Sequence, residues 1–181
     1  MTLSQEDGRL FFQLFIPLLG FVNEKYKIRK YLYHSAKPLR ADYDALLAVA
    51  ERLWNEVSLI DEYLAEQQDL TPEHREILLS WKRCIRDTFI LDRYQRGAAI
   101  LISPKDKKVY RAIGITSSFP EMFQRSHVPL ILETTLLPFR DVIISDGLFR
   151  SQSVVLGAGA AKESADLYRD AKSNNTIIEK L

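Results

Sequence analysis

The side chains that could carry chemistry lie mainly in the last third of the chain. Asp146 precedes Gly147 after an apolar run, while Arg140 and His127 lie between apolar runs. A pocket that gathers Asp146, His127 or Glu133 with perturbed ionisation would indicate acid–base catalysis. An Asp in a turn usually hydrogen-bonds its own backbone, however, so a structural role competes for Asp146. Asp146, Arg140 and His127 are therefore functional candidates only.

A glycine-containing turn at Gly157 and Gly159 is the second candidate, because it follows an apolar run and precedes a predicted helix. In dinucleotide-binding folds, glycines at such a turn let the backbone approach pyrophosphate, and a later acid, here Glu179, binds ribose. Lys162 occupies the position of the third glycine, which counts against that site. A simpler anion site, formed by helix-start amides and Lys162, and a turn without a ligand both remain open. We expect no cofactor.

The sequence gives little indication of a metal site or of a catalytic nucleophile. The three histidines, His34, His74 and His127, do not have the spacing of a helical metal motif, so no metal site is predicted. A Gly-x-Ser-x-Gly motif does not occur. The single cysteine, Cys84, excludes an internal disulfide and is expected to be a buried thiol on the helix that begins near Thr71. The sequence assigns no catalytic residue, and the balance is against an enzyme.

Charge lies in blocks although its total is balanced, with 25 basic and 24 acidic residues and a net charge of +1. Residues 41–76 are acidic, whereas residues 1–40 and 77–112 are basic. The blocks could attract one another within the fold or in an oligomer, or the acidic face could dock a basic partner. The basic segment 82–111 also contains Phe89, Tyr94 and Tyr110, which leaves nucleic-acid binding as an alternative. The balanced total charge argues against it.

The most apolar segment, residues 10–22, is too short to span a bilayer, which needs about 20 residues. The residues before it do not have the charge pattern of a signal peptide. We therefore expect a cytoplasmic protein without a membrane partner. Beside an acidic helix face, residues 10–22 are a candidate self-association surface.

Hydrophobic periodicity predicts helices in the first half of the chain and strands in the second. Helices are expected from Ser4, from Asp42 to Leu64, from Thr71 to Ile85, near Ser118 and over residues 162–172. Strands are expected at residues 89–91, 98–102, 109–115, 130–137, 142–144 and 154–156, with a short one at 177–178. Asp146-Gly147 is expected to form the turn of a hairpin between residues 142–144 and 154–156.

This order predicts an α+β fold. A helical region, residues 1–86, packs on a mainly antiparallel sheet of five or six strands, residues 87–181, in one compact unit. The sheet can curl into a barrel, and the C-terminal helix covers an open end or an edge.

Distinctive motifs occur at residues 59–64, 79–83, 136–139, 143–148, 168–172 and 177–181, including Leu-Leu-Pro-Phe and Ile-Ile-x-Asp-Gly-Leu. Because of these motifs, residues 18–181 resemble an uncharacterised family of bacterial proteins, mostly from Firmicutes. That family carries three consecutive glycines where this chain has Gly157, Ala158 and Gly159. The resemblance implies a bacterial cytosolic protein with a shared fold, and it supplies no catalytic residues because the family has no known activity.

The hypothesis that best fits these patterns is a non-catalytic interaction or regulatory module, which binds another protein or itself. A small enzyme and nucleic-acid binding through residues 82–111 are the alternatives. The motifs offer a way to choose between them. Burial of Phe139 and Leu148 in a core would assign the motifs to folding, whereas a cleft shared by Asp146 and Arg140 would assign them to function.

Overall fold

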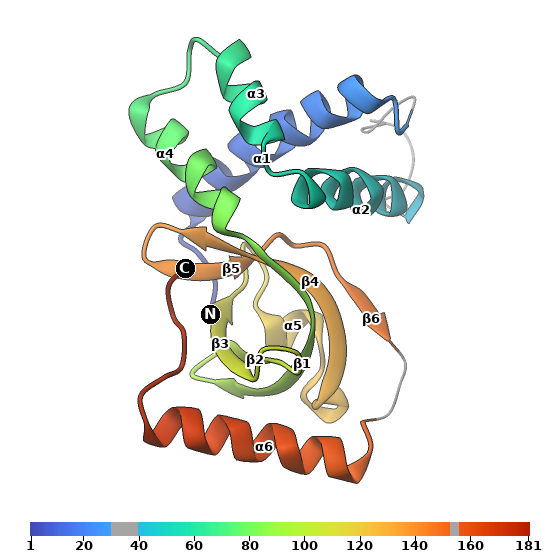
Figure 1. Ribbon diagram of the computed structural model, residues 1–181, viewed down its shortest axis with the longest axis vertical. Coiled ribbons are helices and arrows are strands. Elements are labelled where there is room, and N and C mark those ends of the chain that lie inside the picture. The colour runs from blue at the N-terminus through green and yellow to red at the C-terminus, as the bar shows by residue number, and fades with distance from the viewer. Residues whose placement is uncertain (30–39, 153–155) are drawn as a thin grey trace. The chain divides into compact units, whose positions relative to one another are not determined.

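The computed structural model describes residues 1–29, 40–152 and 156–181, which form two compact units (Figure 1). Residues Arg9–Lys82 form a helical unit, and Met1–Gly8 together with Arg83–Leu181 form a unit built around a sheet. The expected α+β class and the closure of the sheet into a barrel are confirmed.

The helical unit comprises α1 (Gln5–Tyr26), α2 (Arg40–Asn55), α3 (Leu59–Glu66), α4 (Pro72–Ser80) and the 3-10 turn η1 (Trp81–Arg83). The first turn of α1 and the last residue of η1 belong to the other unit. Two helix starts have the expected caps. Ser4 Oγ accepts a hydrogen bond from Asp7 N at 3.0 Å, and Thr71 Oγ1 accepts one from His74 N at 3.2 Å. Aromatic rings form much of the core, notably those of Phe11, Phe15, Trp54 and Trp81.

Two helix predictions in this unit were wrong. The helix expected from Asp42 to Leu64 is interrupted after Asn55, and α3 begins at Leu59. Hydrogen bonds from Glu56 N to Leu53 O and from Leu59 N to Glu56 O close two consecutive tight turns there. Leu53 and Ile60 are both buried on either side of these turns, so the apolar periodicity continues across them and conceals them.

The third helix ends earlier than predicted, at Ser80, and Ile85 begins a strand. Cys84 therefore lies between a 3-10 turn and a strand, and it is only partly buried. The i, i+4 pattern of apolar residues from Ile77 to Ile85 fits both arrangements, because Ile85 is partly buried and packs against the barrel core instead of a helix partner.

Five strands close the barrel: β1 (Ile85–Gln95), β2 (Ala98–Ser103), β3 (Lys108–Ile113), β4 (Leu130–Phe139) and β5 (Val142–Ser145). The order is β1-β2-β3-β5-β4, and β1 also pairs with β4. Only β3 and β5 run parallel. The short helix α5 (Phe119–Met122) lies between β3 and β4 in sequence, and Phe119 is part of the barrel core. A closed five-stranded barrel with this order has the topology of an OB-type barrel.

Strand β1 pairs with two neighbours because it changes register in its middle. Residues 85–91 pair with β4, while residues 90–95 pair with β2. The register shifts between Leu91 and Arg93, so Asp92 forms a bulge. A bulge bends a strand and increases its twist, which lets β1 complete the closure.

The hairpin expected at Asp146-Gly147 is wrong. Strands β5 and β6 (Arg150–Gln152) do not pair with each other, because both pair antiparallel with β4. Ser145 stands opposite Leu136 and Arg150 opposite Glu133, so residues 146–149 bulge out opposite residues 134–135. Gly147 adopts a φ of 80°, which glycine tolerates without steric cost. Of the strand expected at 154–156, residues 154 and 155 lie outside the described residues.

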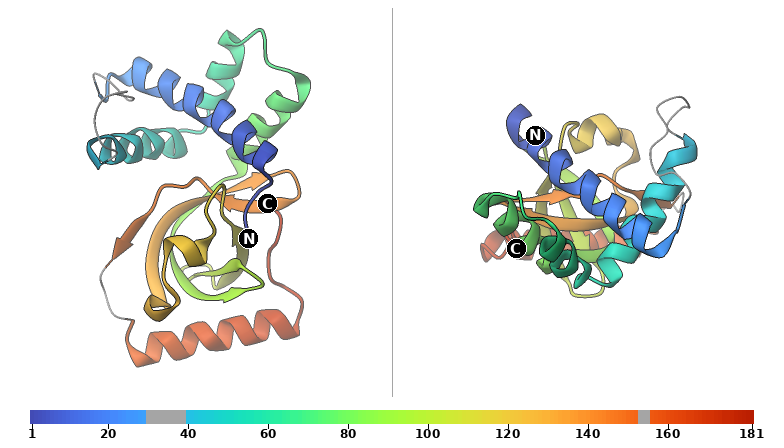
Figure 2. Two further views of the ribbon diagram at one scale, coloured as in Figure 1. Left: turned by 180° about the vertical axis from the view of Figure 1, so that it is seen from behind. Right: turned by 90° about the horizontal axis from the view of Figure 1, so that it is seen from above.

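Helix α6 (Ala158–Ser173) begins before the predicted residue 162 and covers the outer face of the barrel, where an end or an edge was expected (Figures 1 and 2). Its Tyr168 and Ala171 pack against four residues of β1, β2 and β3: Ile90, Ile100, Ile102 and Val109. Such an apolar outer face must be shielded from water, which accounts for the position of the helix. The short strand expected at 177–178 forms a single parallel bridge between Ile178 and Tyr110.

The first residues of the chain also pair with the barrel. Thr2 forms a parallel bridge with Gly114, and Leu3 N donates to Gly114 O at 3.1 Å. At Gly114 the backbone turns sharply, and a Cβ would overlap the backbone oxygen of Ser117. Glycine is therefore required at this position by close approach of the chain to itself.

We expect Gly114→Ala to lower the free energy of unfolding by about 1–3 kcal/mol, because the backbone must move to relieve the overlap. Urea denaturation followed by circular dichroism measures this change. Gly159→Ala is the matched control in the same unit, since no atom lies within 4 Å of a Cβ there. It should leave stability unchanged or raise it by up to about 1 kcal/mol. Equal effects of the two variants would contradict the assignment.

Candidate functional site

Asp146 is buried, with 4% of its surface exposed, and its carboxylate holds the β5–β6 bulge together. Its Oδ1 accepts a hydrogen bond from Leu148 N at 3.0 Å, and its own N–H donates to Thr135 O at 2.9 Å. Thr134 Oγ1 lies 3.0 Å from Leu148 O and 3.3 Å from Asp146 Oδ1. These contacts give the carboxylate a structural function in the bulge.

The other two single-residue candidates do not join Asp146. Arg140 lies in the turn between β4 and β5, where its guanidinium forms an ion pair with Asp7. His127 is exposed at the end of the 3-10 turn η2 (Arg125–His127). Phe139 and Leu148 are only 1% and 8% exposed. This burial of Phe139 and Leu148 is the arrangement that assigns the sequence motifs to folding.

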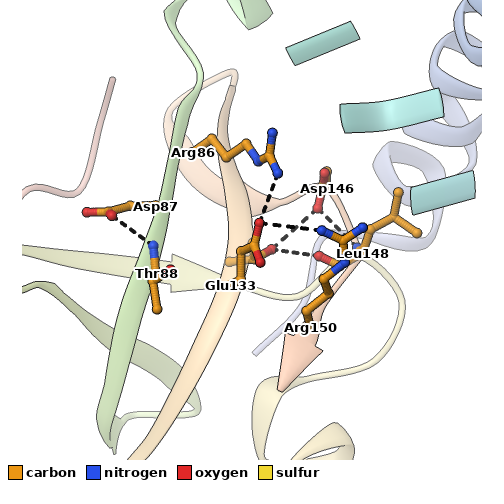
Figure 3. Close-up of polar contacts among 8 residues, drawn as sticks. Arg86, Asp87, Thr88, Glu133, Asp146, Leu148 and Arg150 are labelled. Atoms are coloured by element: carbon orange, nitrogen blue, oxygen red, sulfur yellow. Dashed lines mark hydrogen bonds and ion pairs between the residues drawn. The ribbon is translucent and has the colours of Figure 1, made fainter. Parts of the chain in front are cut away.

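Glu133, which the sequence offered for a pocket, instead joins three strands on the barrel surface (Figure 3). Its Oε1 lies 2.9 Å from Arg86 Nη2 on β1 and 3.8 Å from Arg150 Nη1 on β6. In Figure 3, Arg86 and Arg150 approach Glu133 from either side, while Asp87 points away from it. Sequence spacing could not reveal this cluster, because strand pairing brings the three residues together.

The turn at Gly157 and Gly159 precedes and begins α6, with Gly157 as its N-cap. Gly157, Gly159 and Lys162 are all exposed. The first buried side chain of the helix is that of Ser164, whose Oγ donates to Asp92 Oδ1 at 2.6 Å. Glu163 forms an ion pair with Lys107, so contacts of α6 with the rest of the barrel unit begin at the residue directly after Lys162.

The basic segment 82–111 is largely engaged within the fold. Phe89 and Tyr110 contact each other edge to face inside the barrel, where they cannot stack on a base. Tyr94 donates a hydrogen bond to Phe123 O at 2.6 Å. Among the basic side chains, ion pairs are formed by Lys82, Arg86, Arg93, Lys107 and Arg111. In addition, the β2–β3 face, which binds ligands in many OB-type barrels, is covered by α6.

A groove between α1 and α3 is a concave site that sequence reasoning missed. It has a volume of about 440 Å³ and is lined by Phe21, Glu24, Lys25, Glu62 and Glu66. Lys25 forms an ion pair with Glu62, and the Phe21 ring lies 5.6 Å from the Tyr63 ring. Three glutamates and one lysine give the lining a formal charge of −2. The acidic block at residues 41–76 supplies Glu62 and Glu66 and was a signal for part of this site. The other lining residues come from α1, which is distant in sequence.

Cys84 carries an unreactive thiol. Burial, assisted by the nearby Asp146 carboxylate, raises the pKa of Cys84 to about 11. At neutral pH the nucleophilic thiolate is therefore scarce. Within residues 1–29, 40–152 and 156–181, His, Cys, Asp and Glu side chains do not form a group of three that could hold a metal ion.

Replacing Asp146 should affect stability, since Asp146→Ala leaves the buried Leu148 N–H without its acceptor. We expect a loss of about 1–3 kcal/mol in the free energy of unfolding, measured by urea denaturation. Asp146→Asn keeps an oxygen acceptor and should lose less. His127→Ala, at an exposed site, should stay within about 0.5 kcal/mol of the unmodified chain. An Asp146→Ala variant as stable as His127→Ala would refute the structural role.

Alkylation of Cys84 by iodoacetamide should be about 100-fold slower in the native chain at pH 8 than in the urea-unfolded chain, because the thiolate fraction falls tenfold per pKa unit. The rate should rise up to a pH of about 11. Because the folded pKa lies above the unfolded one, the thiol stabilises the fold below about pH 9, and this contribution is lost as the pH rises towards 11. Asp146→Asn should lower the apparent pKa only in part, since burial is the larger cause. Equal native and unfolded rates would contradict this assignment.

Among the residues that the structure describes, no helix combines the length and apolar character needed to cross a membrane. Comparison with known proteins finds no matching family model, no matching curated protein and no matching solved structure.

Proposed function

We propose that this chain is a non-catalytic interaction module whose helical unit binds a basic segment of a partner protein. The observation that carries the proposal is the α1–α3 groove, with its three glutamates and a formal charge of −2. Its volume of about 440 Å³ falls within the range of known ligand pockets, roughly 300–1,000 Å³.

The groove suits an arginine or lysine side chain for two reasons. Carboxylates form charge-assisted hydrogen bonds with a guanidinium or an ammonium group, and these are stronger than neutral hydrogen bonds. The half-buried ring of Phe21 offers an apolar surface for the aliphatic stem and a π-face for the cation. Lys25 already forms an ion pair with Glu62, so the attraction for a cationic side chain of the partner comes from Glu24 and Glu66.

Self-association is the competing form of the same role. Phe12 and Ile16 are exposed one turn apart on α1, at 37% and 40% of their surface. Most of the apolar side chains of residues 10–22 are instead buried within the helical unit, which leaves a narrow apolar stripe. We place the module in the cytoplasm, a proposal supported by the lone, unreactive cysteine.

The test uses a fluorescent arginine-rich peptide as a probe for the intact chain, with binding followed by anisotropy. The variant Glu24→Lys/Glu66→Lys should bind the peptide at least about tenfold more weakly, because it reverses the charge of the groove. Asp69→Lys/Glu76→Lys makes the same change in net charge at exposed positions outside the groove lining and should bind nearly as well as the unmodified chain. Higher salt should weaken binding.

Two outcomes would overturn the proposal. Equal losses in the two variants would show that only net charge matters, and unchanged binding in the groove variant would exclude the groove. Circular dichroism must first show that both variants are folded. If a sizing column shows a dimer that Phe12→Ser/Ile16→Ser abolishes, and the peptide does not bind, the module self-associates instead.

A further inference from the structure

We propose that one edge of β3 is a docking groove for an extended peptide of a partner protein, and that residues 176–181 occupy it within the same chain. We call these residues the docked segment. This site belongs to the barrel unit and is independent of the α1–α3 groove.

Backbone hydrogen bonds define the groove. Ile178 N donates to Val109 O at 2.8 Å, and Arg111 N donates to Ile178 O at 2.9 Å. Strand β3 has two edges. Strand β2 pairs along one edge, and the docked segment pairs along the opposite edge, ahead of the residues of β3 that pair with β5. The docked segment therefore adds a short parallel strand to the sheet, as peptides do in β-augmentation.

Side chains give the groove a sequence preference. Ile178 and Leu181 are half-buried and pack against the barrel core. Between them, Glu179 Oε1 lies 4.0 Å from Arg111 Nε, and Lys180 Nζ lies 2.7 Å from Asp141 Oδ1. The groove thus fits the order apolar, acidic, basic, apolar, with both charges matched by the barrel.

The docked segment is held by one bridge to β3, by two ion pairs and by the partly buried side chains of Ile177, Ile178 and Leu181. A second peptide with the same pattern can form the same contacts and so replace it. The side chains of Glu179 and Lys180 are 60% and 66% exposed in their ion pairs. Segments with few buried contacts open locally at much lower free energy than the whole fold. When the segment opens, Val109 O and Arg111 N become free edge groups, which attract an extended chain.

Competition from the docked segment sets the apparent affinity for a partner. A peptide binds only the open fraction of molecules, so its apparent Kd rises by the inverse of that fraction. A partner must therefore carry an extended segment of the same pattern at high local concentration, or bind elsewhere on the chain as well.

The experiment measures anisotropy of a fluorescent peptide with the sequence of residues 176–181, Thr-Ile-Ile-Glu-Lys-Leu. The full-length variant Ile178→Asp, whose own segment is displaced, should bind this peptide at least about tenfold more tightly than the unmodified chain does. A peptide with Asp in place of the second Ile should not bind. A peptide with Glu and Lys exchanged should bind more weakly, because each charge then meets a like charge.

A folded Ile178→Asp variant that does not distinguish the matching peptide from the Asp-containing one would refute the groove. Equal binding of the charge-exchanged peptide would refute the proposed preference. If Ile178→Asp fails to fold, Leu181→Asp, at a half-exposed position, takes its place. Hydrogen exchange provides a second test in the unmodified chain, where the Arg111 amide should exchange faster than amides of the β1–β2 ladder and be protected by excess peptide. An Arg111 amide that exchanges only as fast as that ladder would show that the segment never opens, and this too would overturn the proposal.

Discussion

The double pairing of β1 is the constraint on which the barrel unit depends. Residues 85–91 pair with β4 and residues 90–95 with β2, so β1 must curl between its two neighbours. The bulge at Asp92 allows that bend. Asp92 then turns outward to accept the hydrogen bond from Ser164, and the adjacent Arg93 guanidinium lies 4.1 Å from the centre of the Tyr168 ring. The residues that close the barrel therefore also position the helix that covers it.

Most elements of the fold could be predicted because their signals are local. Thr71 and Pro72 mark a helix start by their own chemistry, and the runs of apolar residues at 98–102 and 130–137 mark strands by length and flanking turns. The failures share a different cause. The break after Asn55 preserves the apolar period, and the Asp146-Gly147 pair suits a bulge as well as a hairpin, so only the choice of strand partner distinguishes them.

The candidate sites were harder to predict than the fold. The sequence offered Asp146 both as a functional candidate and as a turn carboxylate that bonds its own backbone, and its buried hydrogen bonds are to the bulge backbone and to Thr134. The α1–α3 groove combines Glu24 with Glu62 and Glu66, which only tertiary packing brings together. The docked segment was anticipated as a short strand, whereas its position beside β3 follows from topology alone. Local chemistry can be read along the chain, but which residues share a surface cannot.

The division of the barrel unit along the chain has a consequence for synthesis. Thr2, near the start of the barrel unit, pairs with Gly114, and Ile178 pairs with Tyr110 after all the strands in sequence order. The helical unit is instead one continuous stretch of chain. A chain that emerges from the ribosome completes Arg9–Lys82 before any strand of the barrel has appeared. During that interval the segment around Thr2 is without its partner strand. The helical unit can thus be assembled early from near neighbours, while the barrel must wait for contacts between distant parts of the chain, the slower kind to form.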